Sequence, residues 1–95
     1  MRPHHTKRDA NHVQLVDDLR AIGAYVQVLA DVGGEVVDLF VVWRGRCIPV
    51  EVKSPGQEHR LTVGERIAIK AMARQGVRVI VATCVEDVLA GWPEE

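Results

Sequence analysis

Three charged side chains are set into apolar sequence near the middle of this chain. Asp38 lies within "VVDLFVVW" (36–43), and Glu51 and Lys53 lie within "CIPVEVK" (47–53). Burying a lone carboxylate or ammonium group costs several kcal/mol unless the group is paired, hydrogen-bonded or bound to a metal. Two carboxylates beside a lysine could bind a divalent cation, or they could form an ion-pair cluster. The choice depends on whether the surrounding elements bring them together.

The turn between the two apolar segments sets the geometry. Arg44-Gly45 suits a two-residue hairpin turn between antiparallel strands. With such a turn, Trp43 faces Arg46, and counting outward places Asp38 opposite Glu51. Directly opposed residues project to the same face of a sheet, with Cβ atoms ~4.5–5.5 Å apart. A three-residue bulged turn would instead put Asp38 on the other face.

Lys53 joins this pair, because it lies two residues beyond Glu51 and so points the same way. Two carboxylates this close destabilise a sheet unless a cation lies between them. Lys53 supplies one positive charge, and a bound Mg²⁺ or Mn²⁺ would supply more. The alternative is a plain ion-pair cluster of Asp38, Glu51 and Lys53 at the rim of the sheet.

Hydrophobic periodicity and turn residues predict the elements that position these side chains. They are a helix over 9–22, strands over 24–30, 36–43 and 47–53, a helix over 62–75, a strand over 77–82 and a last helix over 85–92. This order, α-β-β-β-α-β-α, predicts an α/β fold with a mixed sheet flanked by helices. Because both faces of 36–43 are apolar apart from Asp38, we expect that strand to be covered on both sides.

Capping signals mark the starts of the last two helices. Thr62 and Glu65 have the capping-box spacing, and Thr83 and Glu86 repeat it. We therefore predict a reciprocal pair of hydrogen bonds at each start.

Length and composition indicate a single globular domain. The chain has 95 residues, 47% of them hydrophobic and 26% charged, which argues against both disorder and a membrane protein. We expect a flexible N-terminus over 1–8 and one domain over 9–95. No apolar run approaches the ~20 residues that span a bilayer. The polar start "MRPHHTKRD" lacks an apolar signal segment, so we expect a cytoplasmic protein.

The cysteines and the net charge restrict the kinds of site and partner that this protein could have. Cys47 and Cys84 lie far apart without a CxxC spacing, which favours reduced, buried thiols over a zinc site or a disulfide framework. The net charge of −1 counts against nucleic-acid binding by overall basicity, but a local basic surface could still serve.

The motif "VVD" followed by "EVK" resembles the PD-(D/E)-x-K nuclease signature. Its surroundings are "RDANHVQLVDDLRAIGAYVQVL", "VGGEVVDLFVVWRGRCIPVEVK" and "LTVGE". Together they resemble small phage-type VRR-NUC and Holliday-junction-resolvase-like nucleases over nearly the whole chain. The resemblance implies a restriction-endonuclease-like core and metal-dependent cleavage of branched or structured DNA. It also implies a two-fold symmetric homodimer and a bacterial or phage origin.

The resemblance also assigns roles to the central residues. Asp38, Glu51 and the backbone carbonyl of Val52 would bind Mg²⁺ or Mn²⁺, and Lys53 would orient the attacking water or stabilise charge on the phosphate. Carboxylate-held metal and a neighbouring lysine suit phosphodiester hydrolysis, which needs a nucleophile made from water and neutralisation of growing negative charge. Val37 stands where the signature has proline.

Several further residues are candidates for supporting roles. Asn11 matches an asparagine common among those nucleases, or it makes a helix-start hydrogen bond. Where relatives often carry a metal-facing glutamate, this chain has His12 and Gln14, neither of which is a strong Mg²⁺ ligand. Glu65 stands near a glutamine of the relatives, so it could approach the site or serve only as the capping partner of Thr62.

A basic surface could contact DNA phosphates, or it could be a solvated helix face. Arg66, Lys70 and Arg74 fall at i, i+4 and i+8 on one predicted helix. The predicted DNA-binding residues are Arg44, Arg46, Arg60, Arg66, Lys70 and Arg74. Two alternatives to a nuclease stay open: a catalytically inactive nucleic-acid-binding or scaffolding module with the nuclease fold, and a structural interaction protein whose charges form only an ion-pair cluster.

Overall fold

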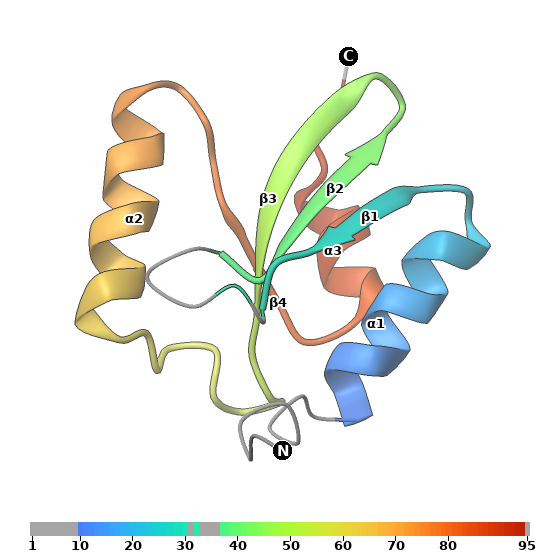
Figure 1. Cartoon of the computed structure of the whole chain (residues 1–95), viewed down its shortest axis with the longest axis horizontal. Coiled ribbons are helices and arrows are strands. Elements are labelled where there is room, and N and C mark those ends of the chain that lie inside the picture. The colour runs from blue at the N-terminus through green and yellow to red at the C-terminus, as the bar shows by residue number, and fades with distance from the viewer. Residues whose placement is uncertain (1–9, 31, 33–36, 95) are drawn as a thin grey trace.

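The computed structural model describes residues 10–30, 32 and 37–94. The elements in chain order are α1 (Ala10–Ala21), β1 (Tyr25–Val28), β2 (Leu39–Trp43), β3 (Arg46–Val52), α2 (Val63–Arg74), β4 (Ile80–Ala82) and α3 (Val85–Gly91). The protein is a small α/β domain, as predicted, and the described elements follow one another in the predicted order (Figure 1). The predicted flexible segment 1–8 lies outside the described residues.

The sheet is mixed and has the strand order β1-β2-β3-β4. β1 pairs with β2 and β2 with β3 in antiparallel fashion, whereas β3 and β4 are parallel. Parallel strands need a crossover connection, and α2 lies in the segment that connects β3 to β4. The sequence prediction of a mixed sheet is therefore confirmed.

The turn between β2 and β3 has two residues, as the sequence predicts. Arg44 has a φ of 52° and Gly45 a φ of 76°, and positive φ at both central residues is what a type I′ turn requires. Trp43 consequently pairs with Arg46, and Leu39 pairs with Val50. Asp38 and Glu51 are the next residues outward, one position beyond the last recorded pair of the two strands, and the predicted site depends on their opposition.

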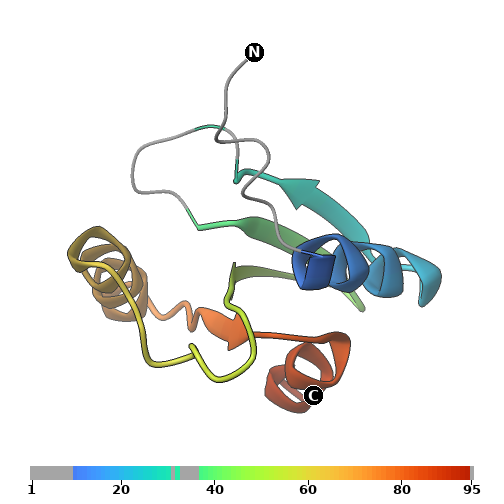
Figure 2. The same ribbon diagram turned by 90° about the horizontal axis from the view of Figure 1, so that it is seen from below.

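The helices lie on both faces of the sheet, but they pack unequally. Figure 2 shows α1 and α3 on one face and α2 on the other. The core lies between the sheet and α1 and α3, and its largest fully buried side chains include Leu15, Leu19, Leu39, Val41, Val50 and Val88. α2 stands apart (Figure 1), and none of its 12 residues is buried. The fold thus has one well-packed face and one open face.

β2 shows this difference directly. Its side chains alternate between buried and exposed, with Phe40 36% and Val42 39% exposed on the side of α2. The prediction that this strand is covered on both sides was therefore wrong. Residue type identified both faces as apolar, but it could not show that α2 stands off from one of them.

The two helix starts differ from each other. At α2 the Thr62 hydroxyl accepts a hydrogen bond from the backbone N–H of Glu65, and the Glu65 carboxylate accepts one from the backbone N–H of Thr62, so this capping box is confirmed. At α3 the Thr83–Glu86 box was wrong. The N-cap is Cys84, and Asp87 accepts from Thr83 N at 2.9 Å and Thr83 Oγ1 at 3.0 Å. The N-cap is one residue later than the predicted box requires, and the acid that reaches back is one residue later too.

Both cysteines are free, and neither is fully buried. Cys84 is half-buried, whereas Cys47 is exposed. The prediction of buried thiols was wrong for Cys47, because this residue lies on the open face of the sheet. Among the described residues, no helix is long and apolar enough to cross a membrane.

Candidate active site

Asp38, Glu51 and Lys53 meet at the end of the β2–β3 hairpin that is remote from its turn. Asp38 directly precedes β2, and its negative charge is close enough to raise the pKa of Glu51. Lys53 Nζ lies 3.9 Å from Glu51 Oε2, and the Lys53 side chain is only 15% exposed. The structure therefore brings the predicted catalytic residues together on the α2 side of the sheet.

The carboxylate of Asp38 is held in place by backbone hydrogen bonds. Its Oδ2 accepts a hydrogen bond from Val52 N at 2.8 Å, and its backbone carbonyl accepts one from Leu29 N at 2.7 Å. The N–H and C=O groups of one residue in an extended strand face the same neighbouring strand. The carbonyl of Val52 consequently faces Asp38. The resemblance to nucleases implies that this carbonyl is a metal ligand.

Glu51 is an almost fully buried carboxylic acid, 2% exposed. Burial, a hydrogen bond with Glu65 and the negative charges of Asp38 and Glu65 raise the pKa of Glu51 to about 9, against a smaller opposing effect of Lys53. Lys53 alone therefore does not balance the negative charge of this group. A cation bound beside Glu51 would favour its ionised form.

Glu65 links the first turn of α2 to the site. Its Oε1 accepts hydrogen bonds from Lys53 Nζ at 2.9 Å and from Thr62 N at 2.8 Å. Burial by itself would raise the pKa of Glu65, but hydrogen bonds with Lys53, Glu51 and Thr62 outweigh it and lower that pKa. Both alternatives raised by the sequence hold, because Glu65 caps the helix and also contacts the site.

The candidates on α1 have different positions. The Asn11 side chain donates to the carbonyl of Lys53 at 2.9 Å and to that of Thr83 at 3.4 Å, which ties the start of α1 to the ends of β3 and β4. His12 is buried, 6% exposed. Gln14 is exposed and donates to Asp18 at 2.7 Å, and no described contact joins it to the carboxylates. Asn11 thus supports the backbone of the site, and Gln14 lies apart from it.

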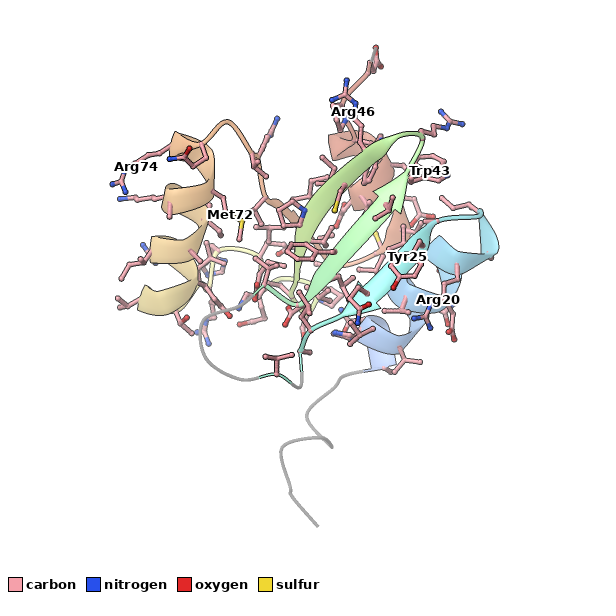
Figure 3. The ribbon with its side chains drawn as sticks, turned by 45° about the horizontal axis from the view of Figure 1, so that its top comes forward. Arg20, Tyr25, Trp43, Arg46, Met72 and Arg74 are labelled. Carbon is pink, nitrogen blue, oxygen red and sulfur yellow. The ribbon has the colours of Figure 1, made fainter. Side chains whose placement is uncertain are left out.

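The predicted DNA-binding residues fall into two groups. Arg44 and Arg46 lie at the turn end of the hairpin, and the Arg44 guanidinium stacks 4.3 Å from the centre of the Trp43 ring. The second group lies on α2, with Arg66, Lys70 and Arg74, or in the loop before it, with Arg60. Arg66 donates a hydrogen bond to the carbonyl of Leu61 at 3.3 Å. Figure 3 shows Arg74 pointing away from the sheet and Arg46 projecting from the turn end.

Arg78 is a basic residue for which the sequence predicts no role. It lines a cavity together with Arg46, although the two residues belong to separate segments. A basic residue just before an apolar strand has no distinctive pattern, so only the fold could reveal this proximity.

The oxygen atoms of the site fit a hard divalent cation. Across the described residues, no three His, Cys, Asp or Glu side chains are arranged to hold an ion by themselves. Mg²⁺, however, retains several waters and is commonly bound through one or two carboxylates. Asp38, Glu51 and the Val52 carbonyl provide that kind of donor set, and the raised pKa of Glu51 marks negative charge that a cation would stabilise.

Comparisons of the chain with protein-family models, with curated proteins and with solved structures find no match. The resemblance to nucleases thus rests on the motifs of the chain itself.

Proposed function

We propose that this protein is a metal-dependent endonuclease that hydrolyses phosphodiester bonds of branched or structured DNA. The observation that best supports the proposal is the convergence of Asp38, Glu51 and Lys53 around a carboxylate that is 2% exposed. Buried like charges are costly for a structural protein, and they are typical of sites that must bind a cation or move a proton.

Each residue of the group has a role in this proposal. Asp38, Glu51 and the carbonyl of Val52 hold Mg²⁺ or Mn²⁺, which when bound supplies Lewis-acid stabilisation of the negative charge that grows on the phosphate. The Lys53 ammonium group orients the attacking water or donates to the phosphate oxygen. Glu65 is a positioning residue, because it holds the Lys53 amino group at 2.9 Å.

The hydrogen bond from Val52 N helps to keep Asp38 in register with Glu51. It occupies Oδ2 of Asp38 and leaves the second oxygen of that carboxylate for a cation. A preformed geometry of this kind reduces the reorganisation that binding requires.

Cleavage of a four-way junction would require a homodimer. The described residues of one chain carry one such group, whereas resolution of a junction needs two symmetric cuts. The final helix, α3, is the proposed contributor to the interface, but Trp92 is not exposed enough to take part. Trp92 is 9% exposed and packs edge-on against Trp43 with ring centroids 5.6 Å apart, so it is already part of the core. Leu89 on the same helix is 41% exposed and remains available to a second subunit.

The activity can be tested directly. The protein would be incubated with four-way junction, flap and linear duplex DNA, each with Mg²⁺, Mn²⁺ or EDTA. We expect metal-dependent cleavage of the branched substrates, and we expect it to be lost in Asp38→Asn, Glu51→Ala and Lys53→Ala while DNA binding persists. Asp17→Asn, which changes an exposed carboxylate on α1, is the matched control and should cleave normally.

Other outcomes would identify the alternatives. DNA binding without hydrolysis under any metal would indicate an inactive binding module. Absence of both DNA binding and Mg²⁺ or Mn²⁺ affinity would leave the ion-pair cluster of a structural protein. Sedimentation that shows only a 10.5 kDa species with junction DNA present would contradict the dimer.

A further inference from the structure

The face of the sheet that carries the carboxylates continues into an apolar groove. Side chains alternate along a strand, so Phe40 shares the face of Asp38, and Pro49 shares the face of Glu51. The groove has a volume of about 380 Å³ and lies between these strands and α2, which contributes Met72. Figure 3 shows Met72 on the side of α2 that faces the sheet. Phe40, which is 36% exposed, therefore lies two residues from Asp38, and the buried Pro49 lies two residues from Glu51.

A second cavity, of about 420 Å³, adjoins the groove, because Cys47 and Val77 line both. Arg46 and Arg78 line this second cavity, and no acidic side chain does. Within the part of the chain that the structure describes, neither guanidinium group has an ion-pair or hydrogen-bond partner. Two positive charges thus lie together at one end of the groove, and Arg78 also lines a neighbouring cavity with Glu58 and Asp87.

The order of these features matches the alternation of phosphates and bases in a nucleotide chain. From Glu51 to Cys47 the strand advances four residues along one face, which is about 13 Å at ~3.3 Å per residue, whereas Arg46 alternates to the opposite face. Along that distance the surface changes from carboxylates to an apolar wall with an aromatic ring, and at Cys47 it adjoins the cavity that Arg46 and Arg78 line. Proteins that bind single-stranded nucleic acid combine aromatic stacking surfaces with cationic contacts to the backbone in the same way.

We propose that a short single-stranded segment of the DNA lies in this groove. Its scissile phosphate would be at the carboxylates, an unpaired base against Phe40, Pro49 and Met72, and a farther phosphate between Arg46 and Arg78. The inference rests on the proposed nuclease function and narrows its substrate class to DNA that is unpaired beside the cut. A base cannot enter a groove walled by the sheet and by α2 while it stays inside a duplex, so it must leave the stack.

Binding in EDTA tests the stacking contact without cleavage. Fluorescence anisotropy would compare a labelled single strand with an abasic strand of equal length. Phe40→Ala should weaken binding of the normal strand about 5- to 150-fold, the range expected for loss of one base–aromatic stack, and should leave the abasic strand unchanged. Val42→Ala, a neighbouring side chain of β2 that is 39% exposed and does not line the groove, is the control and should change neither.

A second variant guards against a folding defect. Phe40→Leu keeps an apolar side chain at this partly exposed position but removes the ring, so it should fold normally and still lose affinity for the normal strand alone. Equal binding of normal and abasic strands by the unaltered protein would overturn the stacking contact.

The arginine pair is tested by salt dependence. Each phosphate contact on single-stranded DNA contributes about 0.7 to the slope of log K against log salt. The double variant Arg46→Ala/Arg78→Ala should therefore flatten the slope by about 1.4. Arg20→Ala, which removes a positive charge on α1 at the other face of the sheet, should leave it unchanged.

Competition with inorganic phosphate and with a mononucleotide separates the possible sources of the phosphate. If either ligand binds through Arg46 and Arg78 while the salt slope for DNA is unaltered in the double variant, the cavity is a small-anion site and the inference fails. A cleavage assay separates failure of this inference from failure of the proposed nuclease function. Metal-dependent cleavage with an unaffected Phe40→Ala variant would refute the groove alone, whereas base-dependent binding without cleavage would refute the nuclease alone.

Discussion

The amino group of Lys53 lies 2.9 Å from Glu65 Oε1, and so a residue that follows β3 is bound to the first turn of α2. Because α2 buries none of its residues, this ion pair and the capping box are its principal polar attachments to the rest of the described chain. The orientation of the lysine and the anchoring of the helix therefore depend on the same carboxylate.

Two variants separate these roles of Glu65. Glu65→Gln can still complete a capping box, but it removes the charge that holds Lys53. We expect near-normal protection of the α2 amides from hydrogen exchange together with slower single-turnover cleavage. Thr62→Ala should do the opposite, with α2 less stable by roughly 1 kcal/mol and the cleavage step little changed. Equal slowing in both variants would show that Glu65 acts only through the helix.

The buried carboxyl of Glu51 should make the stability of the metal-free protein depend on pH. Burial, together with Glu65 and Asp38, raises the pKa of Glu51 from 4.5 to about 9, so the folded state retains a proton that the unfolded state loses. This contribution is fully present below pH 4.5 and is lost as the pH rises toward about 9. Urea unfolding in EDTA should show a free energy of unfolding that falls across this window.

The matched variants of that experiment are Glu51→Gln and Glu86→Gln. The first removes the titrating group and should flatten the dependence, whereas the second changes an exposed acid of α3 and should preserve it. Added Mg²⁺ should stabilise the protein most at high pH, because the ligand must be ionised to bind metal. Stability that rises with pH between 5 and 9 in EDTA would contradict the account of Glu51.

Asp87 gives a pH dependence of the opposite sign. Hydrogen bonds from the backbone and hydroxyl of Thr83 lower the pKa of Asp87 below its ordinary value of 3.8. Its contribution is present above pH 3.8 and is lost as the pH falls through the lowered pKa. Asp87→Ala should cost roughly 0.5–1.5 kcal/mol in the free energy of unfolding at pH 7. A comparable cost for Glu86→Ala would instead support the capping box that the sequence predicted.

The basic row on α2 makes a prediction for duplex DNA. If Arg66, Lys70 and Arg74 contact phosphates, neutralising each should flatten the slope of log K against log salt by roughly 0.9. Such contacts carry no base information, so the triple change to Ala should weaken binding of all sequences of one shape alike. Saturating protein should still cleave. An unaltered duplex slope would mean that the row is only a solvated helix face.

The parts of the site that the sequence predicted depend on local rules. Arg44-Gly45 specifies a turn length, the turn specifies the register, and the register specifies that Asp38 opposes Glu51. The capping box of Thr62 and Glu65 is likewise contained within four residues. Interactions of this kind can be read from spacing because the backbone geometry of a turn or a helix end is fixed.

The parts that it did not predict depend on how separate elements approach each other. Nothing in the residue type of Phe40 shows that α2 stands off from it, and nothing near Arg78 shows that Arg46 lies across the same cavity. The bridge from Asn11 to the carbonyls of Lys53 and Thr83 joins segments 42 and 72 residues apart. A shift of the N-cap by one residue, from Thr83 to Cys84, was enough to change the acid that bonds back to the helix start from Glu86 to Asp87.

The two-residue turn at Arg44-Gly45 makes the active site sensitive to chain length far from its own residues. Loops usually accept insertions and deletions more readily than the strands they join. Here one added residue would slip the pairing of β2 and β3, and a slip of one residue turns every side chain of a strand to its other face. Asp38 would then point toward the layer of α1 and α3, about 20 Å of strand away from the altered position. Natural variants of this chain should therefore keep the length of the turn, with residues that accept positive φ at both of its positions.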